Sequence, residues 1–411
     1  MTEDWKARLA LLRGRIARID HKYRVEASSR PLPVHYEAER LLSGQVVENR
    51  HGCFFLSEKI FPAHRRHGGV ELSRLVELEA DLLPDVSGGE IPAADPRRWA
   101  FLDTETTGLA GGAGTCAFLV GVGTIEEAGF RVRLFFMRDY DEEAAMLAAL
   151  AELLAGYQVL VSYNGKAYDA PLLRTRYRLA RLPDPLDGLA HLDLLFAARR
   201  LWRLRLESCR LIELEREILG FEREGDLPGE MIPYYYFEYL RTRQAFRLVP
   251  LFHHNTMDIL TLAALAAVVL PAFASPAGSG LRHGEDLLGL ARWLARKQDP
   301  ETALEVYRRA VDQGLADSNL FRALWEMAGM ERKRGRPDRA VEIWRDLAAS
   351  RNPWRRQALE ELAKHYEHRQ RDYRQALEAT AAALEIQPLP ALERRRERLE
   401  RRAAREAERL I

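Results

Sequence analysis

The sequence predicts an α/β domain with a mixed sheet flanked by helices, followed by an all-α domain of helical repeats. Two observations predict the first domain: short apolar runs end in turn residues, and helical patterns alternate with them beyond residue 96. A third observation predicts the second domain, because similar segments beginning at Ala303, Ala340 and Ala376 recur at steps of 37 and 36 residues. With 411 residues, the chain is long enough for two or three domains with cores of their own.

The composition is that of an ordinary globular protein, 47% hydrophobic and 30% charged, and 62 Lys and Arg nearly balance 61 Asp and Glu. Any nucleic-acid binding must therefore come from local patches. The cysteines Cys53, Cys116 and Cys209 follow no ligand spacing, which favours a reducing compartment. Residues Met1–Arg15 lack the apolar core of a signal peptide, and the most apolar stretch, Ile259–Leu270, is too short to span a bilayer. We therefore expect a cytoplasmic location and no membrane partner.

The first part of the chain predicts a small extension. Residues 1–30 alternate apolar and basic positions, as in one amphipathic helix. Residues 45–62 contain two β-rich runs around the turn signal Asn49–Gly52, which predicts a hairpin. A segment rich in Pro and Gly, residues 84–98, predicts a linker. We place a helix and a small β-containing extension in residues 1–95.

Two carboxylates follow the first buried strand of the α/β domain. The apolar run Trp99–Leu102 predicts that strand, and Asp103 and Glu105 stand at its end at positions i and i+2. In an extended chain this spacing places both side chains on one face. Because two neighbouring acids repel each other unless a cation lies between them, the pair indicates a divalent metal. The alternative is a pair of acids at a strand end that face water.

The following segments predict the remaining strands and helices. Apolar and alternating patterns predict strands over Ala117–Gly123, Phe130–Met137, Gln158–Tyr163 and His191–Phe196, and helical spacing predicts helices over Glu142–Leu154 and Glu207–Leu219. Within the fourth of these strands, Asp193 is interpreted as a structural residue and not as a metal ligand.

Two further acids lie beside predicted helices. Asp169 stands just ahead of a helix, where the alternative to a functional role is a plain helix cap. His254 and Asp258 are i, i+4 at the start of the strongly apolar helix Ile259–Val269, so they share one face. A carboxylate and an imidazole at the start of a buried helix require partners.

Three motifs in this order resemble those of the DEDD exonuclease superfamily, which has the ribonuclease H-like fold. The motifs are Asp103-Thr104-Glu105-Thr106, Tyr163-Asn164-Gly165-Lys166-Ala167-Tyr168-Asp169 and His254-Asn255-Thr256-Met257-Asp258. Within that superfamily the chain is most similar to the YprB-like proteins. This family joins a ribonuclease H-like domain to tetratricopeptide repeats, and the segment Asp226-Leu-Pro-Gly229 also matches it.

The resemblance implies a two-metal active site. Asp103, Glu105, Asp169 and Asp258 are the catalytic carboxylates and the metal ligands. Hard carboxylate oxygens select Mg²⁺ or Mn²⁺, and two ions are expected.

The resemblance also implies a general base and substrate contacts. The superfamily has a His five residues, or a Tyr four residues, before the last Asp, and here His253 and His254 occupy these two positions. The His-Asn-x-x-Asp pattern favours His254 as the base, and His253 remains open. We expect Thr106, Asn164 and Lys166 to bind substrate; the alternative for Lys166 is a solvated loop lysine.

The predicted organisation is a ribonuclease H-like DEDD exonuclease domain over 96–275 and a tetratricopeptide-like domain over 276–411. The expected activity is metal-dependent 3′→5′ hydrolysis of phosphodiester bonds in DNA or RNA, single-stranded or with a free 3′ end. Because repeat arrays present a concave groove, a protein partner is expected for the second domain. Two alternatives stay open, a nucleic-acid-binding scaffold without cleavage activity and a structure-specific endonuclease.

Overall fold

The structure is a computed structural model that describes residues 14, 39–108, 114–297 and 299–409. Apart from residue 14, the helix predicted over residues 1–30 lies outside the described residues. The chain divides into two compact units. The first comprises residues up to Arg199 together with Glu207–Ser275, and the second comprises Arg200–Leu206 and Pro276–Ile411.

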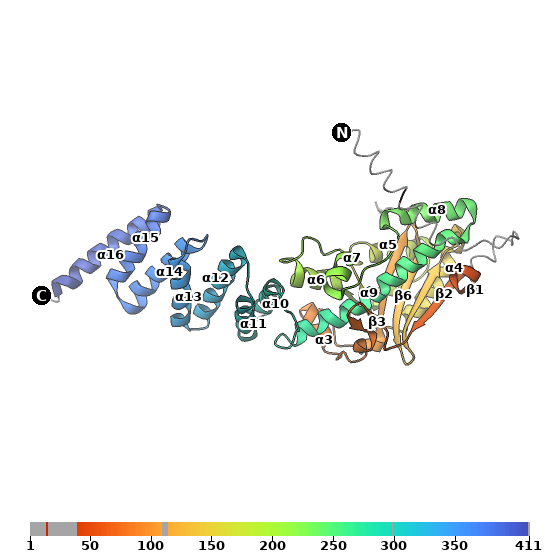
Figure 1. Cartoon of the computed structure of the whole chain (residues 1–411), viewed down its shortest axis with the longest axis horizontal. Helices are drawn as coiled ribbons and strands as arrows, with labels where there is room; N and C mark the ends of the chain where they lie inside the picture. The colour runs from red at the N-terminus through yellow and green to blue at the C-terminus, as the bar shows by residue number, and fades with distance from the viewer. Residues whose placement is uncertain (1–13, 15–38, 109–113, 298, 410–411) are drawn as a thin grey trace, which may run out of the picture. The chain divides into compact units, whose positions relative to one another are not determined.

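The first unit is built on a mixed sheet of seven strands in the order β1-β2-β7-β6-β5-β8-β9 (Figure 1). Its strands are β1 (Gly44–Asn49), β2 (Gly52–Phe61), β5 (Trp99–Thr106), β6 (Ala117–Glu126), β7 (Gly129–Phe136), β8 (Val159–Ser162) and β9 (Ala190–Asp193). The first five strands of this sheet in chain order pair antiparallel, whereas β8 and β9 run parallel to β5. Two short strands, β3 (Arg66–His67) and β4 (Val70–Glu71), form a separate hairpin.

The predicted N-terminal hairpin is part of this main sheet. β2 pairs with β7 along seven residues, from Phe55 opposite Phe136 to Phe61 opposite Phe130. The hairpin therefore does not form an extension of its own, because the apolar face of β2 is buried against the same core as β7. Phe55 is fully buried and packs edge-on against Phe136.

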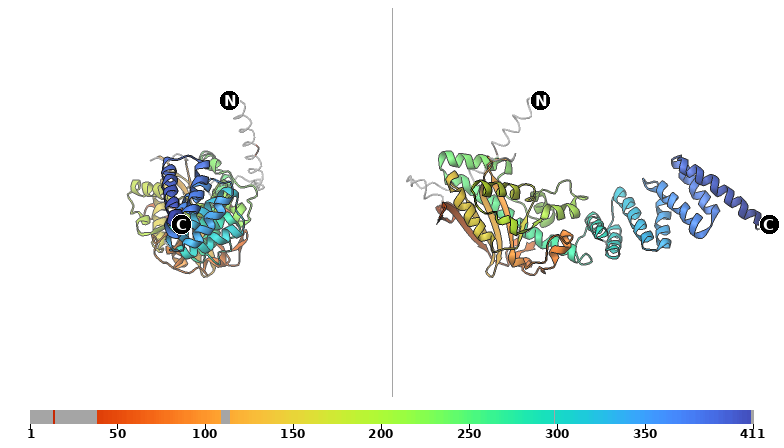
Figure 2. Two further views of the ribbon diagram at one scale, coloured as in Figure 1. Left: turned by 90° about the vertical axis from the view of Figure 1, so that its left-hand side faces the viewer. Right: turned by 180° about the vertical axis from the view of Figure 1, so that it is seen from behind.

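Helices cover both faces of the sheet (Figures 1 and 2). Those that begin in the first unit are α3 (Leu82–Ser87), α4 (Glu143–Leu154), α5 (Asp169–Leu179), α6 (Leu194–Trp202), α7 (Leu211–Leu214), α8 (Ile232–Thr242) and α9 (Val249–Ala274). The long helix α9 crosses β5, β6 and β7 on one face, and α4 packs on β1, β2 and β7 on the other. The helix predicted over Glu207–Leu219 is shorter: α7 continues into a π-helical turn, Glu215–Leu219, and ends at Gly220, whose φ is +64°.

Helix α9 is the centre of the core. Its segment is long and apolar enough to cross a membrane by length and composition, yet 83% of its most apolar window is buried inside the protein. A helix that is apolar on all sides is expected when it lies in the core of a large domain. His254 and Asp258 belong to a short polar stretch of this helix, His253–Asp258, which apolar residues flank on both sides.

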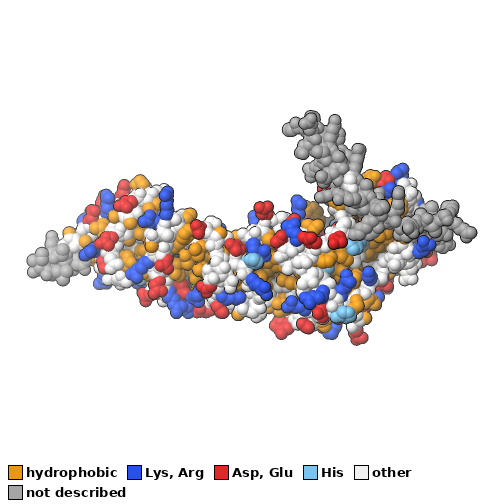
Figure 3. Space-filling view, in the orientation of Figure 1, with side chains coloured by type: hydrophobic (Ala, Val, Ile, Leu, Met, Phe, Trp, Pro, Cys, Tyr) orange, Lys and Arg blue, Asp and Glu red, His pale blue; other side chains and the backbone are white. Residues whose placement is uncertain are grey.

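The second unit consists of successive antiparallel helix pairs and a final helix. They are α10 (Gly284–Arg296), α11 (Pro300–Asp312), α12 (Asp317–Lys333), α13 (Pro337–Ala349), α14 (Arg355–His365), α15 (Tyr373–Ile386) and α16 (Pro390–Arg409). Helices α11 and α15 begin with a capping aspartate: Asp299 and Asp372 accept hydrogen bonds from the backbone N–H groups of Thr302 and Gln375. Figure 3 shows side chains of both charges along this unit, with Lys and Arg gathered near the turn between α12 and α13.

Candidate metal and active site

The carboxylates of β5 face helix α9. Asp103 and Glu105 lie on the same side of the strand, as the i, i+2 spacing predicts, and Asn255 of α9 donates a hydrogen bond from Nδ2 to Asp103 Oδ2 at 2.8 Å. Opposite Asp103, strand β6 carries Gly121. An added Cβ at Gly121 would lie 2.0 Å from Asn255 Oδ1. The missing side chain thus lets α9 approach the sheet closely enough for Asn255 to hold Asp103.

We expect Gly121→Ala to lower the free energy of unfolding by about 1–3 kcal/mol, because the new methyl group overpacks the contact between β6 and α9. It should also displace Asn255 from Asp103. Chemical denaturation measures the stability change. Gly188→Ala is the control, since a Cβ there would meet no atom within 4 Å. Equal stability of the two variants would contradict the close packing at Gly121.

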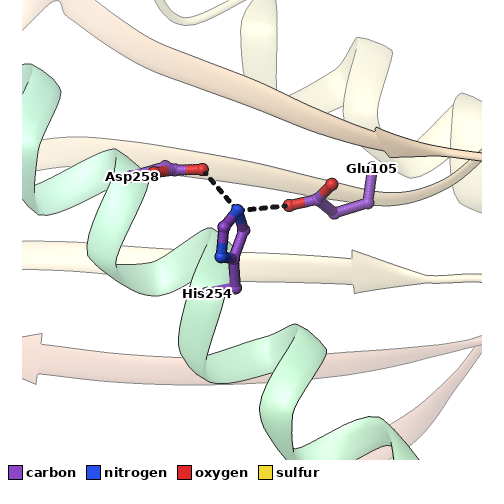
Figure 4. A group of neighbouring side chains, drawn as sticks. All are labelled: Glu105, His254 and Asp258. Atoms are coloured by element: carbon purple, nitrogen blue, oxygen red, sulfur yellow. Dashed lines mark ion pairs between the residues drawn. The ribbon is translucent and has the colours of Figure 1, made fainter. Parts of the chain in front are cut away.

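His254 lies between two of the carboxylates (Figure 4). Its Nε2 atom is 3.3 Å from Asp258 Oδ2 and 3.9 Å from Glu105 Oε1. One ligand atom from each of the three residues lies within 4.8 Å of the other two. Helix α9 begins at Val249, so His254 and Asp258 occupy its second and third turns. The sequence placed them at the helix start. The helix begins earlier, at Val249, because the residues before His253 are also apolar and most of them are buried in the core.

Asp169 completes the group from the other side of β5. It is the first residue of α5, and its Oδ1 accepts a hydrogen bond from Thr104 Oγ1 at 2.5 Å. The capping position of α5 is held by Tyr168, without a side-chain capping bond, so Asp169 does not act as the cap. Asp169 and Asp103 line the same cavity, which has a volume of about 270 Å³.

Burial raises the pKa of three of the carboxylates, Asp103, Glu105 and Asp169. Burial is the largest cause of the raised pKa of Asp103, followed by the charges of Asp258, Glu105 and Asp169. Burial likewise raises the pKa of Glu105 to about 8, against the opposing charge of His254. Burial raises the pKa of Asp169 to about 6. So many carboxylates in one place are unfavourable without a compensating positive charge.

The site fits a divalent cation. Glu105 is 8% exposed, and its Oε1 atom accepts no hydrogen bond from any described residue. A buried carboxylate oxygen without a donor is costly unless it has a ligand. The available donors are carboxylate oxygens with one imidazole nitrogen, and this set suits Mg²⁺ or Mn²⁺.

Two of the three predicted substrate residues line the cavity beside the carboxylates. Thr106 and Asn164 are in its wall, whereas Lys166 is exposed and outside it. Asp193 is a structural residue, as predicted. It accepts hydrogen bonds from the backbone N–H groups of Asn164 at 2.7 Å and Lys166 at 3.1 Å, and this fixes the loop that precedes Asp169.

The two adjacent histidines face different surroundings. His253 lines another cavity, together with Phe252 and Met257. His254 faces the carboxylates, and its Nδ1 atom lies 2.8 Å from Asp226 Oδ2. Although burial opposes the charge on His254, the carboxylates of Asp258, Asp226 and Glu105 together raise its pKa to about 9.

Behind the site lies a buried ion-pair network that the sequence did not predict. The guanidinium of Arg223, 3% exposed, contacts Asp258 Oδ1 at 2.5 Å, Glu215 Oε2 at 2.6 Å and Asp226 Oδ2 at 3.0 Å. Arg223 thus fixes one oxygen of Asp258, and Asp226 links Arg223 to His254. Asp226 belongs to the segment Asp226–Gly229 that matches the similar family, but its position in the sequence does not predict its contacts with Arg223 and His254.

Comparison with known proteins identifies relatives of the chain. Residues 100–270 match the family model described as the RNase_H superfamily. The chain is 31% identical over 338 residues to "Uncharacterized protein YprB" from Bacillus subtilis (strain 168), and the match covers 80% of each chain. The range that the family model matches includes all four carboxylates of the site and His254.

Proposed function

The chain belongs to the family of Bacillus subtilis YprB and contains an RNase H superfamily domain, and we propose that it is a DEDD-type 3′→5′ exonuclease. The superfamily implies a nucleic acid as substrate. The observation that supports cleavage is the gathering of Asp103, Glu105, Asp169 and Asp258 around one site, where a buried oxygen of Glu105 lacks a donor.

We propose that Asp103, Glu105, Asp169 and Asp258 hold two Mg²⁺ or Mn²⁺ ions. When bound, such ions activate the attacking water and stabilise the charge on the leaving oxygen. The residues of the chain then orient the substrate and move the proton. Thr106 and Asn164 are suited to position the terminal nucleotide, because they line the cavity beside Asp103 and Asp169.

The proposed general base is His254. It reaches the carboxylates through Nε2, while Asp226 at Nδ1 fixes the orientation of the imidazole ring. We expect His254→Gln to lower kcat by about 10²–10⁴-fold, the range typical of a lost general base. His253→Gln is the matched control, because its side chain lies in a different cavity. If His253→Gln caused the larger loss, the assignment of the base would be reversed.

Metal affinity should rise with pH. Without a cation, the pKa of Glu105 is about 8 and that of Asp169 about 6, in both cases chiefly because of burial. Since a cation binds the ionised carboxylate, protons compete with it below these values. We expect Mn²⁺ to bind more tightly at pH 8.5 than at pH 6 and to release protons as it binds. Isothermal titration in buffers of different ionisation enthalpy measures both effects, and equal affinities at the two pH values would contradict them.

The activity is tested with single-stranded DNA and RNA labelled at the 5′ end, incubated with Mn²⁺ and separated on a denaturing gel. A ladder that shortens from the 3′ end, and that a chelator abolishes, would support the exonuclease. Cleavage of a circular single strand would instead support the endonuclease alternative. Binding without any cleavage would support the scaffold.

For the second unit we propose tetratricopeptide-type repeats over residues 276–411. Each repeat would be one of the observed helix pairs, α10 with α11, α12 with α13, and α14 with α15. The sequence steps of 37 and 36 residues match the spacing between these pairs. A repeat array of this kind offers an extended binding surface to a partner.

A further inference from the structure

The helical unit contains a groove along α12, which we name the α12 groove. Its volume is about 470 Å³. It is lined by residues of α10–α14, namely Arg292, Ala295, Arg296, Tyr307, Arg322, Trp325, Glu326, Gly329, Met330, Arg332, Lys333, Trp344 and Glu361. Every lining residue belongs to the second unit.

The groove carries an excess of positive charge. Five of its lining side chains are Arg or Lys, and two are Glu. The glutamates are already neutralised: Glu326 pairs with Arg292 and Arg322, and Glu361 pairs with Arg332. The other two cations, Arg296 and Lys333, are exposed and form no ion pair with any residue that the structure describes. Such a surface attracts an anion.

Two hydrogen-bond donors in the groove wall lack acceptors. The indole Nε1 of Trp344, a residue only 3% exposed, has no hydrogen-bond partner among the described residues, and the same holds for Nη2 of Arg292. A buried donor without an acceptor is unfavourable, so each indicates a missing ligand atom. A ligand that accepts hydrogen bonds and carries negative charge would satisfy both.

The groove wall also contains the flat rings of Trp325 and Trp344. The rings of Trp325 and Trp354 stack with their centroids 5.3 Å apart and an angle of 14° between their planes. The guanidinium of Arg332 lies 5.7 Å from the centre of the Trp344 ring. Indole and guanidinium planes are the surfaces on which nucleobases stack. Carboxylates of an acidic peptide would use the cations but not the stacked rings.

We propose that the α12 groove binds single-stranded nucleic acid. Arg296 and Lys333 contact phosphates, the free donors of Arg292 and Trp344 bind phosphate or base oxygens, and Trp325 offers a stacking surface. The choice of nucleic acid over an acidic peptide rests partly on the proposed function of the first unit. The groove would hold a stretch of the strand that the nuclease site degrades.

The test is fluorescence anisotropy of a labelled 20-nucleotide strand, DNA or RNA, titrated with the full chain in EDTA so that no cleavage occurs. The variant is Arg296→Glu/Lys333→Glu, which changes two exposed side chains. The control is Arg374→Glu/Arg401→Glu, the same charge change at exposed positions of α15 and α16 outside the groove. A fluorescent peptide of ten glutamates serves as the competing ligand.

We expect the groove variant to bind the strand at least tenfold more weakly, and the control to bind within about twofold of the natural chain. The slope of log affinity against log salt should fall by about 1.4, since each phosphate contact to a single strand contributes about 0.7. Equal losses in both variants, or no loss, would overturn the proposal. It would also be overturned if the peptide bound through the groove and the strand did not.

The two proposals fail separately. A chain that binds the strand through the groove but never cuts it with Mn²⁺ would refute the nuclease and leave the groove assignment intact. If the natural chain cuts the strand but the groove variant binds it normally, the groove assignment is refuted and the nuclease proposal stands.

Discussion

Asp103→Asn is expected to lower the rate of nucleic-acid cleavage by at least about 10³-fold, the effect of removing a group that stabilises charge in the transition state. Asp103 lies at the centre of the carboxylate group, because its pKa responds to Asp258, Glu105 and Asp169 alike. Asparagine keeps the shape and can still accept the hydrogen bond from Asn255. The lower cleavage rate should therefore result from the lost charge and the weaker metal binding, while the packing stays unchanged.

The stability of Asp103→Asn distinguishes this explanation from misfolding. The pKa of Asp103 is raised by burial and by its neighbours, so its ionisation destabilises the folded chain as pH rises above about 4, the pKa of an unfolded Asp. In EDTA at pH 7.5 the variant should melt at the same temperature as the natural chain or higher. Asp187→Asn, an exposed carboxylate outside the site, is the control for cleavage. A lower melting temperature for Asp103→Asn would contradict this account.

Arg223→Met is expected to lower the free energy of unfolding by about 3–5 kcal/mol, the cost of leaving buried charges without their partner. The guanidinium of Arg223, 3% exposed, forms ion pairs with Glu215, Asp226 and Asp258. Methionine fills much of the same volume but supplies no charge and no hydrogen bonds. Since Asp226 holds His254 and Asp258 is a proposed metal ligand, cleavage should fall as well.

Urea denaturation measures the loss, with Arg216→Met as the control. Arg216 is 52% exposed and pairs with Glu213 and Glu217 at the surface, where ion pairs contribute little. Despite burial, hydrogen bonds from His254 and Arg223 lower the pKa of Asp226, and those from His67 and Arg223 lower that of Glu215. The lowered pKa values of Asp226 and Glu215 stabilise the folded chain above about pH 4, and this stabilisation is lost as the pH falls below it. The difference in free energy of unfolding between Arg223→Met and the natural chain should therefore shrink in acid. Similar stabilities of the two variants at pH 7 would contradict the network's role.

Local patterns predicted two pairs of candidate site residues because each pair lies within one element. Asp103 and Glu105 share a face of β5 through the period of a strand, and His254 and Asp258 share a face of α9 through the period of a helix. The strands themselves follow from short apolar runs with clear turn signals. Asp193 was interpreted correctly as structural, and it holds the loop before Asp169.

Contacts between distant segments could not be predicted. Arg223 lies 35 residues from Asp258 in an irregular segment, and no spacing rule connects the two. In the sequence, Gly121 is one small residue in an apolar strand. Only the structure shows that Asn255 occupies the space that a side chain at position 121 would need. The hairpin of β1 and β2 was assigned to a separate extension because strand pairing between β2 and β7 joins residues about 75 positions apart.

We propose that the carboxylate site binds the divalent ions that cleavage needs. The most direct test counts Mn²⁺ bound per chain at pH 8.5, by electron paramagnetic resonance, for the natural chain and for Asp103→Asn. We predict two ions in the natural chain, and at most one weakly held ion in the variant. A natural chain that binds no Mn²⁺, or a variant that binds it equally well, would contradict the account.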